Sequence, residues 1–266
     1  MGKSQSREII REENKIKVVI RAFVGQFFSS SKLFLAIPRY VIYFKEMVNY
    51  FRQEEAEQFS LIELSPKIHE KKEIAGMGGP GFYQNAWAYR SIYNKKPAEH
   101  VDIGSDTMFI GMLSAVTKVT FIDIRPFKTG LPNLECKQGD ILNIPYPDDS
   151  IKSLSCLHVI EHIGLGRYGD KLDPNGTKKA IKELQRVLTP NGNFYLSTPV
   201  GRHRINFNHH RVFSPKYIIN LFSDLNLIEI SGLDGDSKFI QNIDIDILET
   251  LEYSIGLFHF TKKPIL

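Results

Sequence analysis

One stretch of this 266-residue sequence lacks the glycines that a pyrophosphate site would need. From His100 to Pro126 the pattern is strand, turn, short helix and strand, but no G-x-G-x-x-G run opens the helix. Gly104 is followed by Ser105 and Asp106, and the next glycine is Gly111. A pyrophosphate requires close approach of the backbone, which several glycines normally provide. The Asp106 carboxylate would also repel a phosphate, so we do not expect a dinucleotide-dependent oxidoreductase.

Cysteine and concentrated positive charge are also scarce. The two cysteines, Cys136 and Cys156, lie in apolar, strand-like segments, and we expect buried free thiols rather than a disulfide. No cluster of cysteine and histidine has the spacing of a zinc site, so no metal is predicted. The net charge is +4 and the basic residues are scattered, which is too mild a balance to indicate a nucleic-acid partner.

The N-terminal region lacks a clean membrane span. Segment 16–51 is rich in Phe, Val, Ile and Tyr, but basic residues interrupt it and Pro38 is expected to break it, which predicts helices over 17–30 and 40–54. One interpretation packs these helices on the main domain or on a second copy, as in a homodimer. The other docks them to a membrane surface or a partner enzyme. Because the first residues are polar rather than signal-like, we expect a cytoplasmic protein, which the second interpretation places at the inner face of the membrane.

Strand and helix patterns alternate over the rest of the chain. We place an N-terminal helical appendage at 1–75 and the main domain at 76–266, because a glycine-rich loop lies between them. Apolar patterns predict seven strands, at 101–104, 119–124, 134–141, 151–160, 193–200, 227–233 and 254–263. Amphipathic patterns predict helices at 81–96, 178–188 and 215–226. The alternation predicts an α/β, Rossmann-like, mostly parallel sheet with helices on both faces.

Acidic residues end several of these predicted strands, where an open α/β sheet binds its ligands. Asp102 and Asp123 have the spacing of a nucleotide site in which the second acid accepts from ribose hydroxyls. Asp140 can accept from the exocyclic amine of adenine, while Ile124 and Ile141 offer apolar flanks for the ring. Since the glycines for a phosphate are missing, the pattern indicates a nucleoside without phosphates, and S-adenosylmethionine is the candidate.

Histidines follow the fourth and fifth predicted strands, on the same rim. The segment HVIEHIGLGRYGD supplies His158, His162 and Asp170, and the later NHHR supplies His209 and His210. Histidine titrates near neutral pH, so we expect His162 or one of the later pair to accept the proton of an attacking hydroxyl. Local hydrogen bonding within these loops is the alternative. A metal held by the histidines and nearby aspartates has no supporting ligand spacing.

From about Tyr83 to the C-terminus the sequence resembles class I S-adenosylmethionine-dependent methyltransferases. The pieces that carry the resemblance are VDIGS, FIDI, QGDILNIPYPDDSIKSLSCLHVIEHI, ELQRVLTPNGNFYLSTPV and HHRVFSPKYIINLF. More narrowly, HVIEHIGLGRYGD and its surroundings resemble a family of largely uncharacterised bacterial proteins whose genes occur with those for surface carbohydrate synthesis.

The resemblance implies a role for each matching residue. Asp102, Gly104 and Ser105 would contact the methionine end of the cofactor, and Tyr83 and Gln84 would close over it. The predicted cofactor-binding residues are Tyr83, Gln84, Asp102, Gly104, Ser105, Asp123, Ile124, Asp140, Ile141 and His158. The predicted catalytic residues are His162, His209, His210 and Asp170.

These patterns and the resemblance together predict a methyltransferase, and the narrower resemblance implies that it acts on an oxygen of a sugar, a nucleotide-sugar or a surface glycan. One departure from the resembled family supports a different class of function. The family prefers D-x-G-x-G in its first motif, whereas this chain has DIGSD. The alternative is a non-catalytic scaffold or binding protein of a glycan-assembly pathway, with a vestigial cofactor site.

Overall fold

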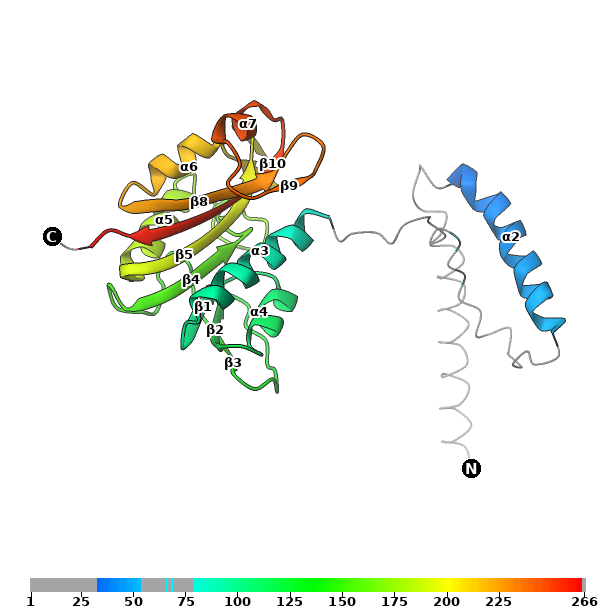
Figure 1. The fold of residues 1–266 in the computed structure, drawn as a ribbon, viewed down its shortest axis with the longest axis horizontal. Helices are drawn as coiled ribbons and strands as arrows, with labels where there is room; N and C mark the ends of the chain where they lie inside the picture. Colours follow the sequence, from blue (N-terminus) through cyan, green and yellow to red (C-terminus); the bar gives the residue numbers. More distant parts are fainter. Residues whose placement is uncertain (1–32, 54–65, 67, 69–78, 265–266) are drawn as a thin grey trace. The chain divides into compact units, whose positions relative to one another are not determined.

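The computed structural model describes residues 33–53, 66, 68 and 79–264, and the chain divides into two compact units, Met1–Met77 and Gly78–Leu266 (Figure 1). In the first unit, helix α2 runs from Leu33 to Phe51 with Pro38 inside it, so the predicted break is wrong. Pro38 lies in the second turn, where a proline removes one backbone hydrogen bond and leaves the later turns intact.

Helix α2 packs locally through Ala36 and Tyr40, which are buried together with Ile68. No helix among the described residues is long and apolar enough to cross a membrane. The predicted helix at 17–30 lies outside the described residues. Docking of segment 16–51 to a membrane or a partner therefore stays a prediction.

The second unit is built on a mostly parallel sheet, as predicted. Its strands are β1 (Glu99–Ile103), β2 (Lys118–Asp123), β3 (Leu134–Gln138), β4 (Ile151–Leu157), β5 (Leu188–Val200), β8 (Leu225–Leu233), β9 (Phe239–Ile240) and β10 (Ser254–Lys262). They are ordered β3-β2-β1-β4-β5-β10-β8-β9. The described sheet thus has eight strands rather than seven, the additional one being the two-residue edge strand β9. Strand β10 is antiparallel to both β5 and β8.

Helices cover both faces of this sheet, as the alternating pattern predicted. Helices α3 (Pro80–Lys95) and α4 (Thr107–Leu113) lie together on one face, where Trp87, Ile92 and Phe109 share one apolar cluster (Figure 1). Helices α5 (Gly176–Val187), α6 (Pro215–Leu221) and α7 (Ile245–Thr250) belong to a second cluster, which buries Leu184 and Ile218. The central strands β1 and β4 are buried on both faces, and they carry buried polar residues such as Asp102 and Ser155 as well as apolar ones.

The strand order reverses beside β1, and this reversal positions the site. From β1 the chain moves outward through β2 to β3, and it then returns to β4 on the other side of β1. The loops that follow β1 and β4 therefore diverge, leaving a crevice at the carboxyl ends of the strands. The two cysteines lie in this sheet as free thiols, with Cys156 buried and Cys136 partly exposed.

A small antiparallel pair stands where a loop was predicted. Strands β6 (Arg204–Asn206) and β7 (His210–Val212) form a hairpin that carries the histidine pair. Strands of three residues are too short to show a hydrophobic period, which explains why the sequence pattern did not reveal them.

Candidate functional site

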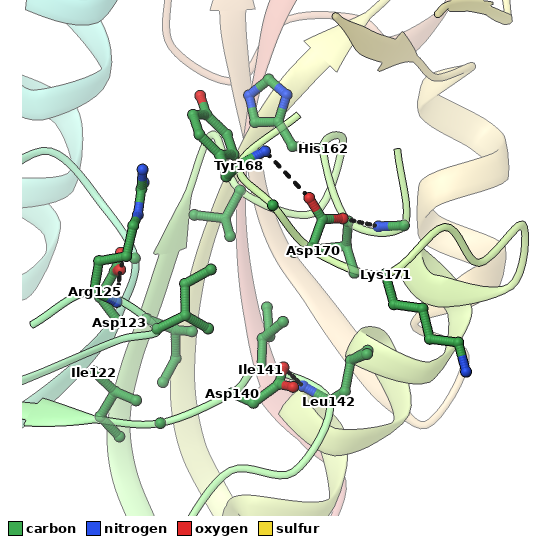
Figure 2. Close-up of a pocket in the computed structure, with 18 of the residues that line it drawn as sticks. Ile122, Asp123, Arg125, Asp140, Ile141, Leu142, His162, Tyr168, Asp170 and Lys171 are labelled. Carbon is green, nitrogen blue, oxygen red and sulfur yellow. Dashed lines mark hydrogen bonds and ion pairs between the residues drawn. The ribbon is translucent and has the colours of Figure 1, made fainter. Parts of the chain in front are cut away.

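A cavity of about 410 Å³ lies at the carboxyl ends of β1 to β4 (Figure 2). This volume is within the usual range for a small-molecule or cofactor site. Its wall includes eight of the residues predicted from the sequence: Gly104, Asp123, Ile124, Asp140, Ile141, His158, His162 and Asp170. It also includes residues that the sequence analysis did not assign, among them Arg125, Leu142, Tyr168 and Lys171.

Asp102 and Ser105 are not in this wall, although both were predicted to contact the cofactor. Asp102 is fully buried at the end of β1 and accepts hydrogen bonds from the Ser105 backbone N–H (3.0 Å) and hydroxyl (2.6 Å). The Ser155 hydroxyl donates to the same carboxylate. Burial raises the pKa of Asp102 to about 6, although these donors oppose the rise. Asp102 therefore holds the loop after β1 in place from beneath the cavity.

The hydrogen bonds around Asp102 continue across β4 through further buried residues. The two ring nitrogens of His100 lie 2.8 Å from the hydroxyls of Ser153 and Ser155. The Ser105 hydroxyl, in turn, accepts from the backbone N–H of Leu157 at 3.0 Å. Burial lowers the pKa of His100 to about 3, so this ring is neutral. Because the Ser155 proton goes to Asp102, the His100 Nε2–H is the donor to Ser155.

Gly104 places bare backbone against the cavity. Its φ is +67°, a conformation that glycine adopts without strain, and its N–H donates to the Ile122 carbonyl at 2.9 Å. A Cβ at this position would lie 3.3 Å from Val159 and 3.7 Å from Asp123 Oδ2. The missing side chain thus leaves room beside the Asp123 carboxylate.

Asp123 and Asp140 present carboxylate oxygens from neighbouring strands. Asp123 Oδ1 accepts the backbone N–H of Arg125 at 2.7 Å, and Asp140 Oδ1 accepts that of Leu142 at 2.8 Å (Figure 2). No described residue hydrogen-bonds the second oxygen of either group. Ile141 is buried beside Asp140, whereas Ile124 is 39% exposed. The wall therefore combines two available carboxylate oxygens with apolar side chains.

In nucleotide-binding folds the N-terminus of the helix after β1 binds phosphate, but here a carboxylate of the chain itself caps the N-terminus of this helix, α4. Asp106 is the N-cap of α4, and its Oδ1 accepts from the backbone N–H groups of Met108 (3.0 Å) and Phe109 (3.2 Å). A capping carboxylate satisfies the donors that a phosphate would use. The arrangement is therefore unsuited to a pyrophosphate, in agreement with the missing glycines.

Tyr83 and Gln84 do not lie at this cavity. Tyr83 stacks on Phe239, with ring centroids 5.8 Å apart, in a separate cavity of about 540 Å³ between α3 and the β8–β10 side of the sheet. Gln84 is buried, and its Oε1 accepts from the Ser197 hydroxyl at 2.6 Å. The predicted closure of these two residues over the cofactor is therefore not seen.

The loop after β4 forms the opposite wall, and Asp170 organises it. Its carboxylate accepts backbone N–H groups of Gly164 (2.8 Å), Gly166 (3.3 Å) and Tyr168 (3.3 Å) (Figure 2). Burial opposes the charge, but these donors hold the pKa of Asp170 below its ordinary value. A carboxylate whose oxygens are engaged in this way shapes the loop and is a poor proton acceptor, contrary to the predicted catalytic role.

Two histidines, His158 and His162, lie against the buried carboxylate of Glu161. Glu161 is fully buried, with His158 Nδ1 at 2.9 Å and His162 Nε2 at 3.7 Å from its Oε1. His162 Nδ1 is 2.8 Å from the His209 carbonyl. Burial lowers the pKa of His162, although Glu161 opposes this shift, and burial also lowers the pKa of His210. His158 and His162 line the cavity, whereas His209 and His210 belong to the hairpin of β6 and β7 and are not part of the cavity wall.

Two guanidinium groups flank an exposed ring at the cavity. Arg125 lies 4.9 Å and Arg167 5.0 Å from the centroid of the Tyr168 ring. Tyr168 is 41% exposed. Arg125 directly follows the predicted ribose-binding segment in the sequence, which is the signal that would have identified it. The described residues contain no group of three or more His, Cys, Asp or Glu side chains suited to holding a metal.

Comparisons with known proteins address the fold. The family described as "Caenorhabditis protein of unknown function, DUF268" matches residues 145–252, which is less than half of the chain. No curated protein matches the sequence. Among solved structures, the [4+2]-cyclase SpnF is 10% identical with a TM-score of 0.50, covering 68% of this chain and 82% of that one. A putative sarcosine dimethylglycine methyltransferase from Galdieria sulphuraria is 16% identical with a TM-score of 0.50, covering 68% and 86%.

These likenesses establish architecture rather than reaction. One neighbour is named for a cyclisation and the other for a methyl transfer, on the same fold. No carbohydrate substrate is named for either, so a link to surface carbohydrate synthesis stays a prediction. The chain has the Rossmann-like α/β fold that class I S-adenosylmethionine-dependent methyltransferases share.

Proposed function

We propose that this protein is an S-adenosylmethionine-dependent methyltransferase. The observation that carries the proposal is the pairing of Asp123 and Asp140 in one cavity, each with one carboxylate oxygen that no described residue engages. Asp123 is suited to accept from the two hydroxyls of a ribose. Asp140 is suited to accept from the exocyclic amine of adenine, with Ile141 against the ring.

The remaining wall fits the same ligand. Gly104 allows the backbone to approach it closely, because a Cβ there would fill the space beside Asp123. The Asp106 carboxylate, bound to the first N–H groups of α4, disfavours a ligand with a pyrophosphate. When bound, S-adenosylmethionine supplies an electrophilic methyl carbon on a sulfonium. The protein has to bind and orient the acceptor and to remove one proton.

We further propose a sugar hydroxyl as the acceptor, carried on a nucleotide-sugar. The support is the cluster of Arg125, Arg167 and Tyr168 beside the cavity. A phosphate suits guanidinium groups, which bind its oxygens in pairs, and an exposed aromatic ring offers an apolar surface to a sugar. Among the described residues, Arg167 has no carboxylate partner, and Arg125 has only Asp123 at 3.9 Å.

The proposal is tested by incubating the full chain with S-adenosylmethionine carrying a labelled methyl group and a pool of UDP-, GDP- and dTDP-hexoses. The expected product is a nucleotide-sugar that is heavier by one CH₂ unit and carries the label. Arg125→Ala should raise KM for the nucleotide-sugar substrate at least about tenfold, because a charge-assisted contact is lost. Lys128→Ala, which removes a nearby positive charge outside the cavity wall, is the matched control.

The scaffold alternative predicts a different outcome of the same experiment. It predicts no labelled product and no protection of the protein from thermal unfolding by S-adenosylmethionine. An oxidoreductase would instead show protection by NAD. Label appearing on a sugar without a phosphate, but on no nucleotide-sugar, would retain the methyltransferase assignment and contradict the nucleotide-sugar acceptor.

A further inference from the structure

A buried carboxylate with an unsatisfied oxygen lies directly behind the cavity wall. Glu161 is 0% exposed, and its Oε1 has no well-aligned hydrogen-bond donor among the described residues, although the His158 Nδ1 lies 2.9 Å away. Its Oε2 has one donor, the Thr198 hydroxyl at 3.4 Å. Burying a charge costs several kcal/mol unless it is paired, so an acid in this position is expected to have a charged or polar partner during function.

His162 is poorly arranged to be that partner and a base at once. Its Nδ1 is 2.8 Å from the His209 carbonyl, which can only accept, and 3.3 Å from Arg167 Nη1, which can only donate; the shorter contact assigns the proton to Nδ1. The bare Nε2 of the neutral ring then faces Glu161 Oε1, another acceptor, at 3.7 Å. Both nitrogens of His162 are thus turned to the protein. The one lone pair of the neutral ring is directed at Glu161 rather than at a methyl acceptor in the cavity, although His162 was predicted as the base.

His158 has the complementary arrangement. Its Nδ1 is 2.9 Å from Glu161 Oε1, and a carboxylate selects the tautomer with the proton on Nδ1. No described residue hydrogen-bonds its Nε2, and the side chain is 30% exposed in the cavity wall. The backbone supports this placement in an unusual way. His158 has a φ of +55°, uncommon for a residue other than glycine, immediately after β4.

We infer that His158 is the general base of the proposed methyl transfer and that Glu161 is the positioning residue that fixes its tautomer. This inference rests on the proposed function. The acceptor oxygen bonds to the methyl carbon as the carbon–sulfur bond breaks, and that electron pair stays on sulfur, which becomes a neutral thioether. The hydroxyl proton passes to His158 Nε2. The resulting imidazolium is balanced by Glu161, which then has the cationic partner that its buried charge requires.

The tautomer is measured without any acceptor. Long-range ¹H–¹⁵N NMR spectra of the full chain with labelled histidine, assigned through His158→Asn, should show a protonated Nδ1 and a bare Nε2. Asparagine is chosen because it tolerates a positive φ. In Glu161→Gln, whose amide both donates and accepts, the preference for this tautomer should weaken. A wild-type ring with its proton on Nε2 would overturn the inference.

Chemical rescue distinguishes a base from a structural residue. His158→Gly suits the local backbone and leaves space for free imidazole. Transfer to the nucleotide-sugar pool should fall by roughly 10²- to 10⁴-fold and recover in part with added imidazole, while affinity for S-adenosylmethionine stays within about threefold. His203→Asn, an exposed histidine outside the wall, is the matched control. Full activity of His158→Gly would contradict the assignment.

Two further outcomes separate this inference from the function on which it rests. A wild-type protein that binds no S-adenosylmethionine would contradict the proposed function itself. Binding and turnover that are lost on chelation and restored by Mg²⁺ would leave that function in place but overturn this inference. In that case Glu161 and the histidines would be ligands rather than a base and its support.

Discussion

The Ser105 hydroxyl donates to Asp102 Oδ2 at 2.6 Å while it accepts the backbone N–H of Leu157 at 3.0 Å. One hydroxyl therefore joins the loop after β1 to the end of β4. These are the two segments that diverge around the cavity. Since both partners are buried, neither can exchange this contact for water.

Ser105→Ala should therefore destabilise the protein. The substitution removes one donor to Asp102 and leaves the buried Leu157 N–H without an acceptor, at a cost of about 1–3 kcal/mol. Urea unfolding followed by circular dichroism measures the change. Ser150→Ala is the control, because that hydroxyl is in an exposed turn. Equal free energies of unfolding for the two variants would show that the hydrogen bonds of the Ser105 hydroxyl do not stabilise the fold.

Gly104→Ala should weaken ligand binding more than it weakens the fold. Its positive φ costs an alanine about 1–2 kcal/mol, and the new methyl group lies between Val159 and Asp123, in the space assigned to the ribose. Affinity for S-adenosylhomocysteine should fall by at least about tenfold. Gly130→Ala is the matched control, because a Cβ there meets no atom within 4 Å. Unchanged affinity in Gly104→Ala would place the ligand elsewhere.

His100 should make stability depend on pH in a defined window. Its pKa is lowered to about 3 by burial, whereas the unfolded chain takes up the proton near 6.5. Its contribution is therefore fully present above pH 6.5 and is lost as the pH falls toward 3. At pH 4 the loss reaches about 3 kcal/mol relative to pH 7.

The measurement compares wild type with His100→Asn by urea unfolding from pH 7 to pH 4. The stability advantage of the wild type should shrink steadily on acidification. Asp102, whose raised pKa acts in the opposite direction, is present in both proteins, and the comparison removes its direct effect. An advantage that stays constant with pH would contradict a neutral buried His100.

Asp170→Asn separates an organising role from a catalytic one. Loss of the charge weakens three backbone hydrogen bonds, so hydrogen exchange at Gly164, Gly166 and Tyr168 should accelerate. The pH profile of methyl transfer should keep its shape, because Asp170 accepts no proton in the reaction. Asp236→Asn, which removes an exposed charge on the β8–β9 turn, is the control. A profile that loses its acidic limb, where a general base becomes protonated, would restore Asp170 as the base.

The sequence predicted the sheet and its ligand-binding edge because strand-like segments alternate with amphipathic helical ones, and because parallel strands present their carboxyl ends together. Asp123, Asp140 and Gly104 follow from that rule, and all three line the cavity. Asp102 follows the same rule but is buried beneath the loop. The sequence pattern shows that an acidic residue lies at the end of this strand. The burial of Asp102 depends on the central position of β1 between β2 and β4, which the pattern does not show.

Other features depend on packing that has no local signal. The packing of helix α3 against the sheet determines where Tyr83 and Gln84 lie. It directs Tyr83 toward Phe239 and Gln84 toward Ser197. The role of Glu161 depends on which ring nitrogen each neighbouring histidine presents to it. The sequence HVIEH brought these residues together, but the sequence analysis assigned the base to His162 and cofactor binding to His158, because the ring nitrogen that each presents to Glu161 has no signal in the sequence.

The central claim is that the cavity beside Asp123 binds the adenosyl group, and calorimetric titration with S-adenosylmethionine tests it most directly. The wild type should bind, and Asp123→Ala should bind more weakly by at least about tenfold, because contacts to a charged acceptor are worth about 1.5–3 kcal/mol. Asp224→Ala, which removes an exposed acid far along the chain, should bind as the wild type does. Absence of binding to a folded wild type, or equal affinity of Asp123→Ala, would contradict the account.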